Sequence, residues 1–344
     1  MAISSILPAQ LTPSRLMAFS FGFAPPAIIE AGIRLGIFDL LDSGARTADD
    51  IATAIGANVR GVRLVLNALV GLDLLTKDPH GRYALTAESA EYLVSGKPTF
   101  HGAFFLLIAA PMFSEWSKLS AIVRHGRPDH RIDEEQNGTK FFQQFVEHIF
   151  PIHLGGARRL AEILRISSLT APCSVLDLAA GSGVWSIAMA QASPHVTVTA
   201  VDWPGIVPIT QKVTAREGVA SRYRFVAGDL HAVDFGSGHA IATLGHILHS
   251  EGEVRSRRLL KKTFDALAPG GTIAIAEILV EANRQAPLPA LLFAVNMLVN
   301  SEAGDTFSLE EITDWLHGAH FNDVRIAEVP GLAPRIILAT KPHR

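Results

Sequence analysis

The stretch Val175-Leu-Asp-Leu-Ala-Ala-Gly-Ser-Gly183 decides the fold of this chain. Its first four residues have the apolar character of a buried strand, interrupted by Asp177. Gly181 and Gly183 then allow a tight turn in which the backbone can approach a ligand closely. A helix is predicted to begin near Val184. A strand, a glycine turn and a helix in this order are typical of a nucleotide site, although a Gly-x-Gly pair alone is weak evidence.

The residues on either side of this turn alternate between strand and helix patterns. Alternation of this kind predicts an α/β fold with a doubly wound, mostly parallel sheet. Two further strands, 323–327 and 335–339, would complete the sheet. The predicted strands are 175–178, 196–201, 223–226, 240–244 and 272–278, and the predicted helices are 184–191, 206–217 and 254–267.

Acidic side chains end the next two strands. Asp202 comes nineteen residues after Gly183, where a carboxylate can accept both ribose hydroxyls of a nucleoside. Asp229 follows the third strand and could accept from an adenine amino group. Each has a simpler interpretation: Asp202 as a helix cap, Asp229 as a turn residue, and Asp177 as an acid bonded to the backbone at a strand end.

The first 98 residues read as short helices followed by a hairpin, which is a winged-helix order. An amphipathic run covers 28–41, and Thr47 is a good N-cap for a helix over 48–55. A further helix over 59–72 precedes hairpin strands at 74–77 and 83–85.

Winged helices often bind DNA, but the charge of this segment argues against that role. Its eight basic residues face nine acidic ones, which is a poor electrostatic footprint for a nucleic acid. The helix over 59–72 is apolar on most sides. We therefore expect this segment to contact a second subunit.

Residues 99–165 read as connecting helices over 104–108, 116–123 and 141–164, with a polar loop over 125–140. Pro151 is expected to kink or interrupt the last helix. The predicted domains are thus a winged-helix-like dimerisation domain (1–98), connecting helices (99–165) and a nucleotide-binding domain (166–344).

Composition places the chain among soluble enzymes. The formal net charge is −3, so bulk charge gives no reason to expect a nucleic acid or membrane partner. Cys173 is the single cysteine, so no intramolecular disulfide can form. The N-terminus lacks the pattern of a signal peptide, and the apolar stretch 104–113 is too short to span a bilayer. A cytoplasmic location is expected.

Taken together, these features resemble the class I S-adenosylmethionine (SAM)-dependent methyltransferases. Nearly the whole chain is similar to the O-methyltransferases that join a winged-helix dimerisation domain to a C-terminal SAM domain, including the caffeic acid, acetylserotonin and bacterial antibiotic and pigment enzymes. The resemblance implies SAM as cofactor, S-adenosylhomocysteine as product, and a homodimer formed through the N-terminal domain. The residues Gly181, Gly183 and Ser186 nearly match an NAD fingerprint, but an NAD site is disfavoured because the Asp-Leu-Ala-Ala lead-in is not typical of it and the Asp202/Asp229 pair suits a nucleoside without a phosphate. The implied cofactor contacts are Asp177, Gly181, Gly183, Asp202, Trp203, Asp229, Leu230 and Gly245.

The resemblance also assigns catalytic roles. His249, after the fourth strand, aligns with the family's general base, and Glu277, at the end of the fifth, aligns with the glutamate that orients it. Two interpretations are open for Asp305: it replaces a second family glutamate, or it is a turn or helix-capping residue. Ser250 and Glu251 depart from the family's Asp and aromatic residue, which leaves a carbon acceptor or a non-methylating enzyme open. A winged-helix regulator that senses SAM is a third alternative, disfavoured by the acidic first domain.

His246 and His249 are three residues apart and could both face a metal, but the sequence shows no obvious third ligand, so no metal is expected. The acceptor pocket is expected between the connecting helices and the SAM domain, lined by apolar side chains that suit a flat, hydrophobic molecule. Aromatic stripes at helical spacing are more often core. The candidate pocket residues are Met112, Trp116, Phe145, His148, His153, His246, Asn296 and Met297.

Overall fold

The computed structural model describes residues 13–327 and 335–343. The chain divides into two compact units, residues 1–110 and 111–344. The division falls inside one continuous helix, α7 (Gly102–Trp116), and not near residue 98. Each unit has its own hydrophobic core.

The first unit is built from short helices and one hairpin, in the order that the sequence predicts. Leu75 pairs with Leu85 across the antiparallel hairpin, and Thr47 caps its helix in a capping box with Asp50. Likeness to a winged helix stays a prediction. The elements are α1 (Ser14–Phe19), α2 (Ala24–Arg34), α3 (Ile37–Asp42), α4 (Ala48–Ile55), α5 (Val59–Gly71), β1 (Leu75–Lys77), β2 (Tyr83–Leu85) and α6 (Ala87–Tyr92).

The amphipathic run over 28–41 is not one helix. α2 ends at Arg34, Gly36 takes a left-handed conformation with φ of 67°, and α3 starts at Ile37. The bend brings Phe38 against Gly32, where a Cβ atom would lie 2.9 Å from the phenyl ring. The apolar positions continue across the bend because both helices pack on one core.

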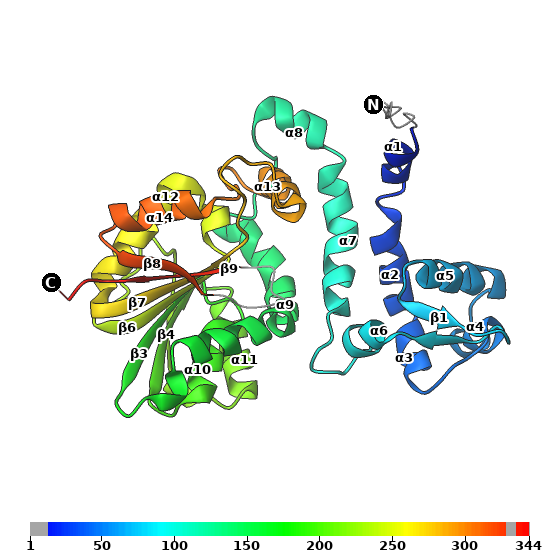
Figure 1. Ribbon diagram of the computed structural model, residues 1–344, viewed down its shortest axis with the longest axis horizontal. Coiled ribbons are helices and arrows are strands. Elements are labelled where there is room, and N and C mark those ends of the chain that lie inside the picture. The colour runs from blue at the N-terminus through cyan, green and yellow to red at the C-terminus, as the bar shows by residue number, and fades with distance from the viewer. Residues whose placement is uncertain (1–12, 328–334, 344) are drawn as a thin grey trace, which may run out of the picture. The chain divides into compact units, whose positions relative to one another are not determined.

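The second unit is a three-layered α/β fold, as predicted (Figure 1). Its described residues form a seven-stranded sheet in the order β5-β4-β3-β6-β7-β9-β8. The first five strands are parallel to one another, and β9 runs antiparallel to both of its neighbours, β7 and β8. The strands are β3 (Cys173–Leu178), β4 (Val196–Asp202), β5 (Tyr223–Ala227), β6 (His239–Gly245), β7 (Leu267–Glu277), β8 (Asn322–Ala327) and β9 (Arg335–Thr340). The helices are α8 (Leu119–His125), α9 (Glu135–Ile163), α10 (Val184–Ala192), α11 (Val207–Arg216), α12 (Leu248–Ala266), α13 (Leu288–Asn300) and α14 (Leu309–Gly318), with short 3₁₀ turns at Ile166–Ser168 and Ala220–Arg222.

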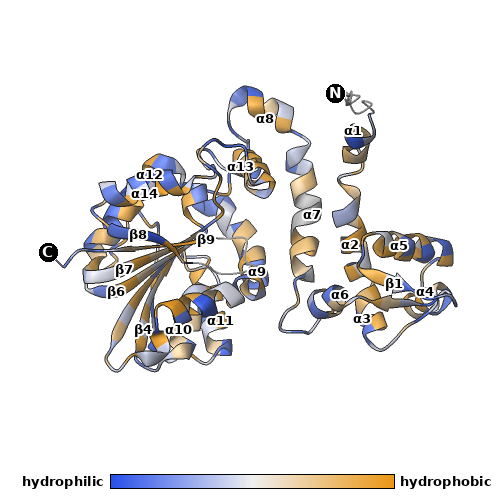
Figure 2. Ribbon diagram, in the orientation of Figure 1, coloured by the Kyte–Doolittle hydropathy of each residue, from blue (hydrophilic) through white to orange (hydrophobic). Residues whose placement is uncertain are grey.

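Alternating strand residues build a separate core on each face of the sheet. In β3, Val175 packs with α9 and α10, whereas Leu176 and Leu178 pack with α12 and α14. The period of two residues along a strand produces this division. Hydrophobic residues accordingly run along the strands, while the outer surfaces of α12 and α14 carry hydrophilic ones (Figure 2).

The connecting region differs from the sequence prediction in two places. α9 begins at Glu135, so the second part of the predicted 125–140 loop is helical. α9 also continues through Pro151 to Ile163, so proline does not interrupt it. The first turns of α9 are rich in polar residues, so the sequence pattern there resembles a loop.

The start of the chain shows exposed apolar side chains. Among the described residues, Ser14–Arg34 is the one helical stretch long and apolar enough to cross a membrane by length and composition, with a mean hydropathy of 1.5. Leu16, Phe19 and Phe21 are each more than 60% exposed. The unit therefore presents an apolar surface that its own core does not cover.

Candidate active site

The turn after β3 is held to the end of β4. Gly181 and Gly183 have φ of 55° and 75°, which glycine adopts without strain. The Gly181 N–H donates to Asp202 Oδ2 over 2.7 Å, and the Trp203 N–H donates to Oδ1 over 2.7 Å. Burial raises the pKa of Asp202 to about 6. Each carboxylate oxygen keeps one lone pair with which it can accept a further hydroxyl.

Asp177 lies deeper than Asp202 and has a different environment. Its Oδ2 accepts from the Ser186 hydroxyl on α10 over 2.5 Å, and its Oδ1 accepts from the Thr243 hydroxyl on β6 over 2.7 Å. Burial, with the nearby Asp202 charge, raises the pKa of Asp177 to about 6. Asp177 therefore links the central strand to its neighbours, and its predicted contact with the cofactor stays a prediction.

The other predicted cofactor residues lie along the same edge. Asp229 Oδ1 accepts from the His231 N–H over 2.6 Å, and its side chain is 44% exposed. Leu230 is buried in the α12 face of the core. Trp203 lies against Phe142 of α9, with 6.2 Å between ring centroids. Gly245 ends β6 where any larger residue would clash with the Trp185 indole.

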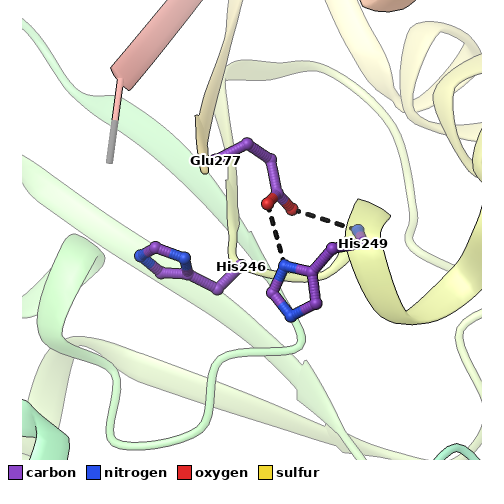
Figure 3. Close-up of side chains that lie close together, drawn as sticks. All are labelled: His246, His249 and Glu277. Atoms are coloured by element: carbon purple, nitrogen blue, oxygen red, sulfur yellow. Dashed lines mark hydrogen bonds and ion pairs between the residues drawn. The ribbon is translucent and has the colours of Figure 1, made fainter. Parts of the chain in front are cut away.

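His249 and Glu277 form a buried pair at the ends of β6 and β7 (Figure 3). His249 Nδ1 lies 2.8 Å from Glu277 Oε2, and the Leu248 N–H donates to Oε1 over 2.8 Å. Burial alone would raise the pKa of Glu277, but the charge and hydrogen bond of His249 outweigh it and hold this pKa below its usual value. An ionised glutamate fixes the imidazole and leaves its other nitrogen available.

His246 stands beside this pair and completes a row of rings. Its ring centroid lies 6.2 Å from that of His249 and 4.4 Å from that of His153. Within the described chain its buried Nε2 has no hydrogen-bond partner. Burial and then the neighbouring His153 hold the pKa of His246 well below its ordinary value, so the ring is neutral near pH 7.

The predicted pocket residues divide into two groups. Trp116 Nε1 donates to Asn296 Oδ1 over 3.3 Å, so these two meet, and His153 joins His246. The second group comprises Phe145, His148, Met297 and Met112. Among these, Phe145 stacks on Phe141, His148 is exposed on α9, Met297 is buried, and Met112 is half-buried.

Asp305 lies near His249 through its backbone alone. Its N–H donates to the His249 carbonyl oxygen over 2.9 Å. Its carboxylate accepts from the Thr306 N–H over 2.7 Å and lies 3.7 Å from Arg284. The structure thus places this carboxylate in a turn before α14, which is the simpler of its two predicted roles.

Two aromatic residues of the site were missing from the prediction. Trp185 stacks near His153 with 6.0 Å between centroids, and Phe293 meets His249 edge to face at 4.9 Å. Trp185 follows the glycine turn by two residues, and Phe293 lies one helical turn before Asn296. These two spacings would have allowed both residues to be predicted from the sequence.

The chain is similar to known O-methyltransferases over most of its length. The family model of the O-methyltransferase domain matches residues 116–322, and that of the O-methyltransferase dimerisation domain matches residues 17–95. The chain is 31% identical over 325 residues to 3-hydroxy-5-methyl-1-naphthoate 3-O-methyltransferase of Streptomyces sahachiroi, covering 92% of each chain. It is 29% identical to bovine acetylserotonin O-methyltransferase, covering 92% of this chain and 95% of the relative.

Solved structures show the same fold over nearly the full length. A Nostoc punctiforme chain described as a candidate O-methyltransferase superposes with a TM-score of 0.89 at 25% identity, covering 97% of this chain and all of the other. Human N-acetylserotonin methyltransferase in complex with SAM superposes with a TM-score of 0.82 at 22% identity, covering 98% of this chain and all of the other.

Proposed function

The chain belongs to the O-methyltransferase family and is a SAM-dependent O-methyltransferase, and on this premise we propose that it methylates a hydroxyl group of a small aromatic or polyketide-like molecule with His249 as general base. The observation that carries the proposal is the buried contact of 2.8 Å between His249 Nδ1 and Glu277. Bound SAM supplies an activated methyl group on its sulfonium. The protein's task is then to position an acceptor and remove its proton.

The pair of side chains suits that task. A phenol has a pKa of about 10, so a neutral-pH enzyme needs a base beside it. Glu277 accepts the Nδ1 proton and leaves Nε2 of His249 with the lone pair that takes the hydroxyl proton. The resulting imidazolium is stabilised by the ionised carboxylate, as in other histidine–carboxylate pairs.

The strand-end residues would hold the cofactor beside this base. Asp202 has lone pairs for ribose hydroxyls, and the exposed part of the Asp229 carboxylate can accept from an adenine amino group. The positive φ of Gly181 and Gly183 lets backbone N–H groups face a ligand closely. All four lie at the carboxyl edge of the parallel strands, where ligands bind in folds of this kind.

The acceptor class is inferred from the rings around His249. Phe293, His246, His153 and Trp185 form an aromatic surround that suits a flat molecule. Two similar bacterial proteins are named for a hydroxynaphthoate and for tetracenomycin polyketide synthesis, respectively. These relatives support a fused-ring phenol as the acceptor.

We also propose that the enzyme acts as a homodimer joined through its first unit. The dimerisation family model covers residues 17–95, and the exposed apolar side chains of α1 and the turn after it lie at its start. A second copy is the occupant that the family model favours for this surface. Cytoplasmic location remains a further expectation.

The test of the base is methyl transfer from labelled SAM to phenols, catechols, hydroxyquinones and hydroxynaphthoates. We expect His249→Ala to lower turnover by about 10²-fold or more, and Glu277→Gln to lower it in the same direction. SAM affinity, measured by calorimetry, should stay within about twofold for His249→Ala, because transition-state contacts affect turnover and not cofactor binding.

His130→Ala is the matched control, because this histidine is exposed in the loop before α9. Its turnover should equal that of the wild type. Transfer that survives His249→Ala would reject the general-base role and indicate a carbon acceptor or a hydroxyl that ionises unaided.

A further inference from the structure

We propose that His246, His249 and Glu277 form a binding site for a divalent transition cation of the zinc class, which blocks the base by occupying its imidazole. His246 and His249 each offer an imidazole nitrogen and Glu277 a carboxylate oxygen, and these three atoms lie within 4.8 Å of one another. The sequence spacing revealed only the two histidines. The third donor comes from the neighbouring strand β7.

The backbone brings the three donors together without help from a ligand. β6 and β7 are paired up to Gly245 and Ala276, and the His246 N–H continues the pairing with a bond of 2.9 Å to the Ala276 carbonyl oxygen. Leu248 N–H fixes the Glu277 carboxylate from the start of α12. His246 directly follows β6, Glu277 ends β7 and His249 lies in the first turn of α12, and hydrogen bonds set the relative position of these elements.

The donor set matches the chemistry of zinc. Two imidazoles and one carboxylate, with a fourth position open, are a common ligand set for this ion. Tetrahedral bonds of about 2.0–2.1 Å place ligand atoms roughly 3.4 Å apart. The widest separation of the donors, which is at most 4.8 Å, must therefore shorten, and the 2.8 Å contact between His249 Nδ1 and Glu277 Oε2 must open if these two atoms bind the ion. His246 can supply this movement, because no hydrogen bond in the described chain holds its Nε2 in place.

The surroundings also favour a bound cation. The Leu248 N–H on Glu277 is an outer hydrogen bond of the kind that fixes a metal ligand. Figure 3 shows Glu277 and His249 joined by hydrogen bonds, with the His246 ring lying to one side of the pair. Phe293 on His249 limits the access of water to the ring, which strengthens interactions with charge.

Occupation of this site would compete with the acceptor. An imidazole whose lone pair binds a cation cannot take a hydroxyl proton, so turnover would fall while SAM still binds at Asp202. This consequence rests on the proposed role of His249, whereas cation binding itself does not. The two ideas can therefore fail separately.

The experiment is a titration of the cofactor-free, full-length protein with Co²⁺, followed by visible absorption and by displacement with Zn²⁺. We expect one tight site per chain with the intense absorption of four-coordinate Co²⁺. His246→Phe keeps a planar ring and should weaken binding by at least about tenfold, as should Glu277→Gln. Circular dichroism and SAM binding confirm that each variant is folded.

His130→Ala serves as the control for surface histidines and should bind Co²⁺ as the wild type does. If His246→Phe and the wild type bind Co²⁺ equally, or if neither gives the four-coordinate spectrum, the site does not exist. A site that binds zinc while leaving turnover unchanged would retain the cation proposal and reject His249 as the base.

Discussion

Asp177 lies buried in the centre of the sheet, and its neighbours determine the free-energy penalty of ionising its carboxyl group. The carboxylate accepts from two hydroxyls, yet burial still raises the pKa of Asp177 to about 6 from an ordinary value of 3.8. The folded protein therefore holds this proton more tightly than the unfolded chain. The resulting stabilisation is complete below pH 3.8 and disappears as the pH rises through 6.

Replacing Asp177 with asparagine should remove this pH dependence. A shift of about two units corresponds to about 3 kcal/mol, so the stability advantage of the wild type over Asp177→Asn should shrink by up to that amount between pH 4 and pH 7. Thermal unfolding of both proteins without cofactor measures the difference. Exposed Asp314→Asn is the control and should run parallel to the wild type. If the stability of Asp177→Asn depended on pH in the same way as that of the wild type, the raised pKa of Asp177 would be contradicted.

The residue scale also shows how far the site could be predicted. His249 and Glu277 were identified through the family resemblance, and their proximity was expected because strand ends of a parallel sheet meet at one edge; the structure brings them into contact. Asp177 and Asp202 looked alike in the sequence, since both end strands. Their difference comes from Ser186 and Thr243, hydroxyl residues distant in the sequence that no local pattern connects to Asp177.

At the scale of elements, the contact between β6 and α10 depends on Gly245. A Cβ atom there would overlap the Trp185 indole, a rigid ring that packs within the core. We expect Gly245→Ala to destabilise the protein by about 1–3 kcal/mol, because overpacking forces ring and strand apart. SAM affinity should fall as well, since Trp185 lies in the helix that follows the glycine turn.

Chemical unfolding and calorimetry measure both effects. Gly155→Ala in α9 is the matched control, because a Cβ atom there meets nothing within 4 Å. That substitution should be neutral or stabilising by up to about 1 kcal/mol, as alanine favours helix. If Gly245→Ala and Gly155→Ala were equally stable, the Trp185 indole would move aside without a free-energy penalty, and the prediction would be wrong.

The elements themselves were predictable where periodicity and end signals agree. The five parallel strands and the Thr47 cap appear as expected. The break at Gly36 was missed because apolar periodicity continues through it. The first turns of α9 were missed because polar residues and Gly138 suggested a loop, whereas this glycine is buried where a side chain would strike Trp203. Such tertiary contacts override local composition.

At the scale of the whole molecule, the sequence predicted the order of the units, and the predicted boundaries at residues 98 and 165 stay a prediction. Alternating strands and helices marked the second unit, and short helices with a hairpin marked the first. The division at residue 110 lies within the apolar helix α7, directly before Pro111, which interrupts the apolar stretch in the sequence but does not end the helix.

Assembly through the first unit gives the prediction at this scale. Phe19 and Phe21 are 66% and 69% exposed and lie in the segment that the dimerisation family model covers. Burying a phenylalanine side chain contributes about 1.5–3 kcal/mol. A homodimer contains both rings twice, so the double variant Phe19→Ser/Phe21→Ser should weaken the dimer by about 6 kcal/mol or more, which is roughly 10⁴-fold or more in dissociation constant.

Sedimentation velocity across a range of concentrations tests this assembly. The wild type should sediment as two copies of the 36.9 kDa chain, and the double variant should shift towards one. Val254→Ser is the control, because Val254 is 74% exposed on the second unit and lies outside the dimerisation segment. If the wild type remained monomeric at every concentration, these rings would stay exposed and the homodimer would be contradicted. If the double variant sedimented like the Val254→Ser control, the dimer would have to use another surface, because losing two buried rings must weaken any interface that contains them.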